Sequence, residues 1–248
     1  MKIGLFIPCY MNELYPDACL ATLKVLEDLK LDVEYPKEQT CCGQPMANSG
    51  CTKSIKDLAI KFVNIFKKYD YIVAPSGSCV AMVKDNYEEF FSKDDKDFEK
   101  VKTSIYELSE FLHDIIKPKS FKAKFPHKIS IHNSCHGHRQ LHLGSPSELN
   151  IPNFSKLKDL LSLVEGVEFC ELQRVDECCG FGGTFCVNEE AISGAMGKDK
   201  VKDHLGSGSK YIVGADMSCL MHMQGIIDRN KDDIETLHFA QILSGGVK

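Results

Sequence analysis

The sequence predicts an α/β protein built from two homologous half-domains with mainly parallel sheets, related by a pseudo-twofold duplication. Short apolar runs alternate with amphipathic stretches of helical length, a pattern typical of parallel sheets covered by helices. Two stretches of the first half also recur in the second: residues 2–9 parallel 128–135, and residues 71–79 parallel 211–219. A repeat of half the chain is too long for a solenoid unit. We therefore expect two half-domains, residues 1–120 and 121–248.

The first half contains three apolar runs of strand length. The expected strands cover residues 2–8, 31–36 and 71–75. A helix is expected to begin near Pro16, because proline is favoured in a first turn. Residues 54–69 place their apolar side chains on one helical face, which predicts a second helix. Residues 92–100 are charged and predict a solvated loop, residues 101–116 predict a helix, and residues 118–126 predict the linker between the halves.

The second half repeats this plan. Its expected strands cover residues 128–133, 167–172 and 211–215. Helices are expected at residues 154–164 and 188–204, again from apolar side chains at helical spacing. Residues 234–238 indicate one additional strand before a short terminal helix.

Eight of the twelve cysteines follow a repeated order that indicates a metal site in each half. An adjacent pair followed by glycine lies between two single cysteines, with intervals of 31 and 36 residues in the first half and 42 and 39 in the second. The eight candidate ligands are Cys9, Cys41, Cys42, Cys79, Cys135, Cys178, Cys179 and Cys219. The single cysteines follow predicted strands, so they are expected to converge at the carboxyl edge of each sheet.

Four thiolates per half can hold a [4Fe–4S] cluster or a tetrahedral zinc ion. The sequence leaves open whether there are one or two clusters and whether zinc occupies one site. Gly43 and Gly180 are expected to supply the backbone freedom that each adjacent-cysteine turn needs. Structural disulfides are disfavoured for a cytoplasmic chain, because that compartment is reducing. The sequence shows no catalytic signature, so the catalytic residues are left unassigned.

The remaining cysteines and histidines have a simpler interpretation. Cys19, Cys51 and Cys170 lie in predicted helices or a strand and are expected in the core, where free cysteine behaves as a small apolar side chain. Cys186 and His222 are alternative ligands of the second site, from their distance to Cys179 and Cys219. His136 and His138, beside Cys135, are expected to tune a cluster or to lie on a solvated helix start.

Composition excludes several classes of partner. A net charge of −5 gives no electrostatic footprint for nucleic acid. The longest apolar run is much shorter than the roughly 20 residues that span a bilayer. The apolar stretch after Lys2 is too short for a signal peptide, so a cytoplasmic location is expected.

The cysteine motifs resemble those of the cysteine-rich (CCG) domain family, to which one component of heterodisulfide reductase also belongs. Three segments resemble the lactate utilization protein A group of that family: residues 178–185 (CCGFGGTF), Ser134-Cys135-His136 with Arg139, and residues 216–222 (DMSCLMH). The resemblance covers nearly the whole chain. It implies an iron–sulfur oxidoreductase subunit of a cytoplasmic complex that oxidises L-lactate to pyruvate, with lactate utilization proteins B and C as partners.

One position departs from the fuller family pattern, which ends in C-x2-C. Ser76 and Asp216 stand where the first of those two cysteines would be, so each half offers four thiols and not five. A cubane, a cluster with one oxygen ligand, or zinc in one half therefore remain open. The alternative function is a scaffold subunit without redox activity, stabilised by zinc or free of metal.

Overall fold

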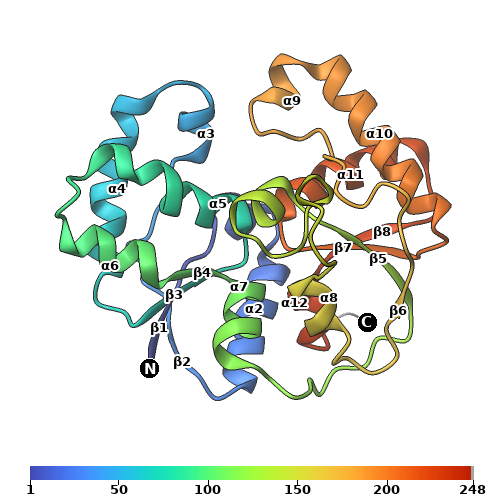
Figure 1. Cartoon of the computed structure of the whole chain (residues 1–248), viewed down its shortest axis with the longest axis horizontal. Coiled ribbons are helices and arrows are strands. Elements are labelled where there is room, and N and C mark those ends of the chain that lie inside the picture. Colours follow the sequence, from blue (N-terminus) through green and yellow to red (C-terminus); the bar gives the residue numbers. More distant parts are fainter. Residues whose placement is uncertain (247–248) are drawn as a thin grey trace.

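The computed structural model, which describes residues 1–246, contains two four-stranded sheets side by side (Figure 1). Every strand pairing within the sheets is parallel. The first sheet comprises β1 (Lys2–Leu5), β2 (Asp32–Glu34), β3 (Tyr71–Ala74) and β4 (Ile105–Glu107). The second comprises β5 (Lys128–His132), β6 (Glu168–Phe169), β7 (Tyr211–Gly214) and β8 (Glu235–His238). The predicted α/β class is confirmed.

The two sheets have the same topology, which confirms the duplication. Their strand orders are β2-β1-β3-β4 and β6-β5-β7-β8. The register also repeats, since Ile3 is paired with Tyr71 and Ile129 with Tyr211. Ser76 and Asp216, which follow β3 and β7 at equivalent positions, form an isolated antiparallel bridge with each other. Pairing of equivalent residues is what a twofold relation between the halves produces.

Helices cover the sheets and connect the strands. The α-helices of the first half are α1 (Cys9–Leu14), α2 (Pro16–Asp28), α3 (Gln44–Asn48), α4 (Thr52–Phe66), α5 (Gly77–Ala81), α6 (Lys96–Ser104) and α7 (Leu108–Glu110). Those of the second half are α8 (Lys156–Leu161), α9 (Phe185–Asn188), α10 (Glu190–Gly206), α11 (Met217–Asn230) and α12 (Phe239–Leu243). Short 3₁₀ or π turns complete the helical segments: η1 (Met82–Asn86), η2 (Tyr87–Phe90), η3 (Phe111–Ile116), η4 (His136–Gln140) and η5 (Ser147–Leu149). Among residues 1–246, no helix combines the length and apolar character needed to cross a membrane.

A shared core joins the halves below the ends of the strands. One cluster of buried apolar side chains contains Leu5 and Val25 of the first half together with Val213 and Phe239 of the second. The helices α2 and α12, from opposite ends of the chain, pack against each other in this region (Figure 1). The halves are thus joined extensively, and the boundary at residue 120 stays a prediction. Residues 247 and 248, the end of the predicted second half-domain, lie outside the described residues.

The stretch from residue 92 to 116 differs from its prediction. The helix α6 begins inside the expected loop and ends at Ser104, and the strand β4 occupies part of the expected helix. Val101, Ile105 and Leu108 are all buried, and their spacing imitates a helical face. Parallel pairing of β4 with β3 overrides that local pattern.

The last residue of β4, Glu107, is a fully buried carboxyl group. Its Oε2 accepts hydrogen bonds from the Ser109 N–H at 2.7 Å, the Ser109 hydroxyl and the Glu110 N–H at 3.3 Å. Its Oε1 has no partner in the described chain. Burial raises the pKa of Glu107 to about 8, because the charged form is poorly solvated.

This raised pKa makes stability depend on pH. The folded state holds the Glu107 proton that the unfolded chain releases, so its contribution is complete below the unfolded pKa and is lost as the pH rises through about 8. Relative to Glu107→Gln, the free energy of unfolding should fall by about 3–5 kcal/mol between roughly pH 5 and pH 9. Urea unfolding of both proteins across this range measures the difference. If the free energies of unfolding of the wild type and of Glu107→Gln changed in parallel with pH, the pKa of Glu107 would not be raised by folding.

Candidate metal centre

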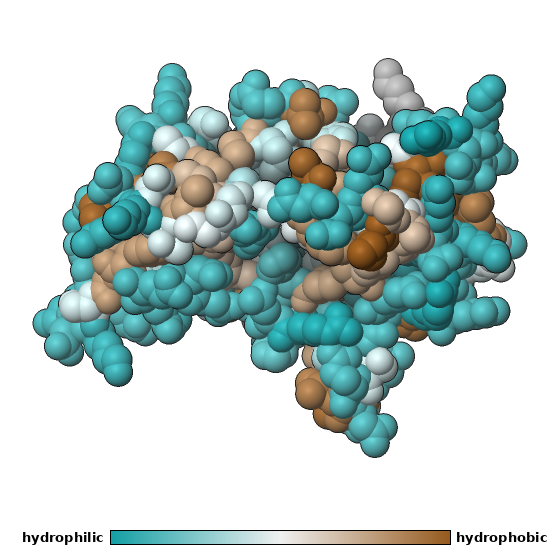
Figure 2. Space-filling view, turned by 90° about the horizontal axis from the view of Figure 1, so that it is seen from above, coloured by the Kyte–Doolittle hydropathy of each residue, from teal (hydrophilic) through white to brown (hydrophobic). Residues whose placement is uncertain are grey.

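All eight predicted cysteines line one cavity of about 580 Å³, to which both halves contribute. Figure 2 views the molecule from above and shows a hollow between the halves, with apolar and neutral side chains gathered around it. The cavity also contains Tyr10, Asn48, His136, Phe181 and Met221. The two predicted sites therefore face a common space.

The fold brings the cysteines together because they follow the carboxyl ends of parallel strands. Cys9 begins α1 directly beyond β1, and Cys135 takes the equivalent place beyond β5. Cys79 and Cys219 lie in the first turns of α5 and α11, which follow β3 and β7. The adjacent pairs lie in the loops after β2 and β6. Each set of four is thus positioned by three strands of its own sheet.

The adjacent-cysteine turns have the same backbone geometry in both halves. The N–H of Gly43 donates to Cys41 Sγ at 3.3 Å, and the N–H of Gly180 donates to Cys178 Sγ at 3.3 Å. Gly43 and Gly180 have φ of 87° and 88°, in the left-handed region that glycine adopts without strain. In the first half, Cys42 and Cys79 bring their sulfurs within 3.3 Å. The expected role of both glycines is confirmed.

The Gly180 position can be tested with a matched pair of variants. A Cβ at Gly180 would lie 2.6 Å from the backbone oxygen of Ser193, whereas a Cβ at Gly50 would meet nothing within 4 Å. Both glycines have positive φ, so alanine adds the left-handed strain of about 1–2 kcal/mol at each. Gly180→Ala should lower the free energy of unfolding by about 2 kcal/mol more than Gly50→Ala, since it adds overpacking. Denaturant titration measures both. Equal losses would mean that the second cysteine loop relaxes without cost.

The thiols of each half form the same electrostatic pattern. Hydrogen bonds from Cys42 and Cys9 to the Cys41 thiolate lower the pKa of Cys41. In the second half, hydrogen bonds from Cys135 and Cys179 lower the pKa of Cys178 in the same way. The first cysteine of each adjacent pair is therefore the preferred thiolate, which is the form that binds metals.

The thiols that donate to these thiolates show the opposite shift. The hydrogen bond to Cys41, then burial, raises the pKa of Cys9. The hydrogen bond to Cys178, then burial, raises the pKa of Cys135. The pKa values of Cys42 and Cys179 are raised as well, first by their hydrogen bonds to Cys41 and Cys178. Each half thus holds a cluster of mutually contacting thiols, a donor set that suits a soft or borderline cation.

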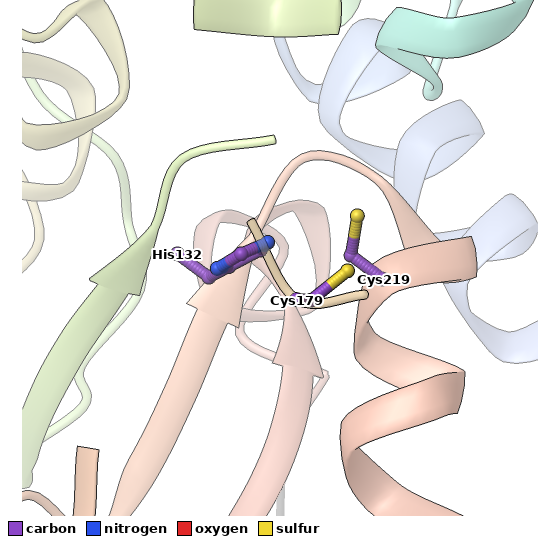
Figure 3. A group of neighbouring side chains, drawn as sticks. All are labelled: His132, Cys179 and Cys219. Atoms are coloured by element: carbon purple, nitrogen blue, oxygen red, sulfur yellow. The ribbon is translucent and has the colours of Figure 1, made fainter. Parts of the chain in front are cut away.

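His132 is a functional candidate that the sequence interpretation missed. It ends β5, and one of its ring nitrogens forms a group with the sulfurs of Cys179 and Cys219, in which the three atoms lie within 4.8 Å of one another. Figure 3 shows the three side chains gathered in one place, with the His132 ring beside the sulfurs of Cys179 and Cys219. A signal was present in the sequence, because His132 occupies the place of Phe6 in the duplicated strand.

The two residues at the position of the missing fifth cysteine are used for a different contact. The Asp216 carboxylate accepts hydrogen bonds from the Ser78 N–H at 2.9 Å, the Tyr10 hydroxyl at 3.2 Å and the Ser218 hydroxyl at 2.8 Å. Ser76 caps α5 and pairs with Asp216 across the halves. Burial and the nearby Asp216 charge raise the pKa of Tyr10, which keeps its hydroxyl available as a donor. The Asp216 carboxylate therefore links the two halves, and both of its oxygens already accept hydrogen bonds.

Other candidates are placed less favourably. Cys186 Sγ donates to the Gly183 carbonyl at 3.0 Å, and the ring of His222 bonds the Ser193 carbonyl at 3.4 Å. His138 is buried, whereas His136 lines the cavity. Among the cysteines expected in the core, Cys19 is buried, Cys170 is half-buried, and Cys51 is exposed at the start of α4. The prediction for Cys51 was wrong, because α4 begins after it and turns its apolar face elsewhere.

A solved structure supports the fold. A hypothetical protein from Helicobacter pylori superposes with a TM-score of 0.64 at 11% identity, over 100% of this chain and 49% of that chain. The chain thus spans about half the length of that structural neighbour.

Sequence comparisons identify the family. The model of the CCG cysteine-rich domain matches residues 3–84 and again residues 129–224. Lactate utilization protein A 1 of Bacillus mycoides (strain KBAB4) is 37% identical over 98% of this chain and 97% of its own length. Lactate utilization protein A 2 of Bacillus cereus (strain Q1) is 37% identical over 100% of this chain and 99% of its own length. The chain therefore belongs to the CCG cysteine-rich domain family, within the group of the lactate utilization A proteins.

Proposed function

We propose that this chain is the iron–sulfur electron-transfer subunit of a cytoplasmic complex that oxidises L-lactate to pyruvate. The observation that carries the proposal is the convergence of two equivalent sets of four cysteines on one cavity. The names of the full-length relatives supply the substrate. Lactate utilization proteins B and C are the proposed partners, and the chain acts as an oxidoreductase subunit that needs them for activity.

The residues of each half fit an iron–sulfur cluster. Cys9, Cys41, Cys42 and Cys79 would hold one cluster, and Cys135, Cys178, Cys179 and Cys219 a second, with [4Fe–4S] as the type that four thiolates support. A bound cluster supplies reversible one-electron transfer. The chain contributes thiolates, amide hydrogen bonds such as those of Gly43 and Gly180, and burial, all of which set the reduction potential.

The proposed chemistry balances without a base from this chain. Oxidation of lactate to pyruvate releases two electrons and two protons at a partner's redox centre. The electrons pass singly through the cavity sites to an acceptor, so one-electron carriers are required between them. The lining of the cavity includes the apolar side chains of Phe181 and Met221 beside the thiols.

A scaffold function is the second candidate, in which zinc or no metal is bound. The bridge between Ser76 and Asp216 favours it, because these residues join the halves at the position of a family cysteine. The shared core that contains Leu5 and Val213 shows that the halves pack on each other through apolar side chains. Such a subunit would dock the other enzymes without carrying electrons.

An assay of the whole complex separates the two functions. Anaerobically loaded protein is combined with proteins B and C and given L-lactate, and pyruvate is measured together with absorbance near about 400 nm, where thiolate-held clusters absorb. The redox function predicts bleaching of this chain and loss of turnover with the double variant Cys42→Ser/Cys179→Ser. Full turnover with that variant, provided it still assembles, would contradict electron transfer and favour the scaffold.

A further inference from the structure

The duplicated halves differ in chemistry at the strand ends that precede Cys9 and Cys135, where the first half has Phe6 and the second has His132. In the first half Phe6 is fully buried, and its ring packs against Phe62 and Phe66 with centroid distances of 4.8 and 5.6 Å. Phe62 and Phe66 lie four residues apart on α4, the helix that precedes β3. The first site therefore rests on an apolar aromatic cluster.

The second half has polar side chains in the corresponding place. His132 stands where Phe6 stands, and its ring lies 6.1 Å from that of His204. Lys200 and His204 are four residues apart on α10, the helix that precedes β7, and both are fully buried. A buried group of titratable residues has thus replaced the aromatic cluster, and it costs free energy unless its polar atoms are satisfied.

Lys200 Nζ and one ring nitrogen of His204 have partners, but His204 Nε2 and both ring nitrogens of His132 have none within the described chain. Lys200 Nζ donates to the Arg174 carbonyl at 2.5 Å, and His204 Nδ1 bonds Ser130 Oγ at 2.7 Å. His132 is 2% exposed, and within the described chain neither of its ring nitrogens has a hydrogen-bond partner. Buried polar atoms are rarely left unpaired in folded proteins, so this ring requires an explanation.

The position of the His132 ring beside two cysteine sulfurs explains why its nitrogens lack protein partners. The ring lies beside the sulfurs of Cys179 and Cys219, in the group whose ligand atoms lie within 4.8 Å of one another (Figure 3). Neutral imidazole is a common metal ligand, and mixed sulfur and nitrogen sets occur at zinc and at iron–sulfur centres. The first half offers no such atom, because its equivalent residue is Phe6.

We propose that His132 binds the metal of the second site directly through a ring nitrogen, beside Cys179 and Cys219. The inference rests on the proposed function only in requiring that this site holds a metal. The shared chemistry is a cation that accepts thiolate and imidazole together, either an iron of a cluster or zinc. In a cluster, His132 would take the place of one of the four thiolates assigned above, that of Cys135 or Cys178, and a neutral imidazole there removes negative charge and raises the reduction potential. The two sites are then inequivalent, and the second is the better electron acceptor.

The atoms that bind the metal can be identified for each site separately, with variants of the full-length protein that retain only one site. Cys42→Ser leaves only the second site complete, and Cys179→Ser leaves only the first. Each protein is loaded anaerobically either with ferrous iron and sulfide or with Zn²⁺ alone. Nitrogen hyperfine coupling is measured on the dithionite-reduced iron form, and zinc X-ray absorption on the zinc form. We expect a nitrogen donor in the Cys42→Ser protein, with either metal that binds, and none in the Cys179→Ser protein.

Substitutions in the Cys42→Ser protein then assign the nitrogen. His132→Phe, which copies the first half, should abolish the nitrogen signal and lower the reduction potential or the zinc affinity. His136→Gln and His222→Gln are matched controls, because one residue lines the cavity and the other faces the Ser193 carbonyl. The signal should persist in both controls. Persistence in His132→Phe, or absence of a nitrogen donor in the Cys42→Ser protein, would overturn the proposal.

Three further outcomes are decisive. If His132→Phe does not fold, the double variant His136→Gln/His222→Gln decides, since a retained nitrogen signal supports His132 and a lost signal assigns the ligand elsewhere. A second site that binds neither metal would overturn the inference. A site that binds only zinc, through His132, would uphold it while contradicting a redox role for that site, so the two proposals can fail separately.

Discussion

Replacing Cys42 by serine is expected to remove one of two clusters and leave the other intact. Cys42 is 2% exposed, and its sulfur lies 3.3 Å from that of Cys79, so no other side chain of that set can take its place without rearrangement. A serine hydroxyl stays protonated where the thiol would ionise, and it is a poor ligand for iron. Iron and sulfide per chain should each fall by about four from a starting value near eight, as for loss of one [4Fe–4S] unit.

The same result is expected for Cys179→Ser, and the double variant should retain no cluster. Cys51→Ser is the matched control, because Cys51 is exposed and lies outside the cavity lining. Its iron and sulfide content should equal that of the wild type. Iron, sulfide and visible absorbance are measured on the anaerobic proteins. A Cys42→Ser protein with full iron content would show that the first set of cysteines does not form a cluster site.

Asp216→Ala is expected to have the largest effect on stability. Its carboxylate is 2% exposed and receives the Ser78 N–H, the Tyr10 hydroxyl and the Ser218 hydroxyl, two of which belong to the other half. Removing the acceptor leaves buried donors unpaired at the junction. The free energy of unfolding should fall by about 3–5 kcal/mol, from several lost charge-assisted hydrogen bonds.

Ser76→Ala is the control at the equivalent position. Ser76 caps α5 through a longer hydrogen bond of 3.4 Å from the Cys79 N–H, so its loss should cost only about 1 kcal/mol. Denaturant unfolding of both variants gives the comparison. Similar losses for the two substitutions would mean that Asp216 contributes only as a helix cap, and that the hydrogen bonds between the halves add little.

The main strands and the convergence of the eight cysteines could be predicted from sequence, because each rests on a local pattern. Apolar runs predicted β1, β3, β5 and β7 within a few residues, and the carboxyl-edge rule predicted that the single cysteines converge. The pattern could not show that both sets share one cavity. That arrangement depends on how the halves pack through α2 and α12, which involves contacts between opposite ends of the chain.

The strand β4 and the candidate His132 were not predicted, because both depend on contacts between segments that are distant in the sequence. The strand β4 was hidden by buried side chains at helical spacing and ends in a buried carboxyl group, that of Glu107. Its counterpart β8 was predicted from residues 234–238, so strict use of the duplication would have located β4. Aligning the two halves would also have shown that His132 stands at the position of Phe6, and so would have identified it as a candidate. Differences between repeats carried information that each repeat alone did not.

The most direct test of the central claim is the content of iron, acid-labile sulfide and zinc per chain in anaerobically purified protein. A visible spectrum before and after dithionite completes the measurement. The account predicts iron and sulfide near eight per chain, about four of each for every cluster, and absorbance near about 400 nm that bleaches on reduction, as expected of thiolate-held clusters. Stoichiometric zinc without iron, and no bleaching, would contradict it and establish the scaffold in its place.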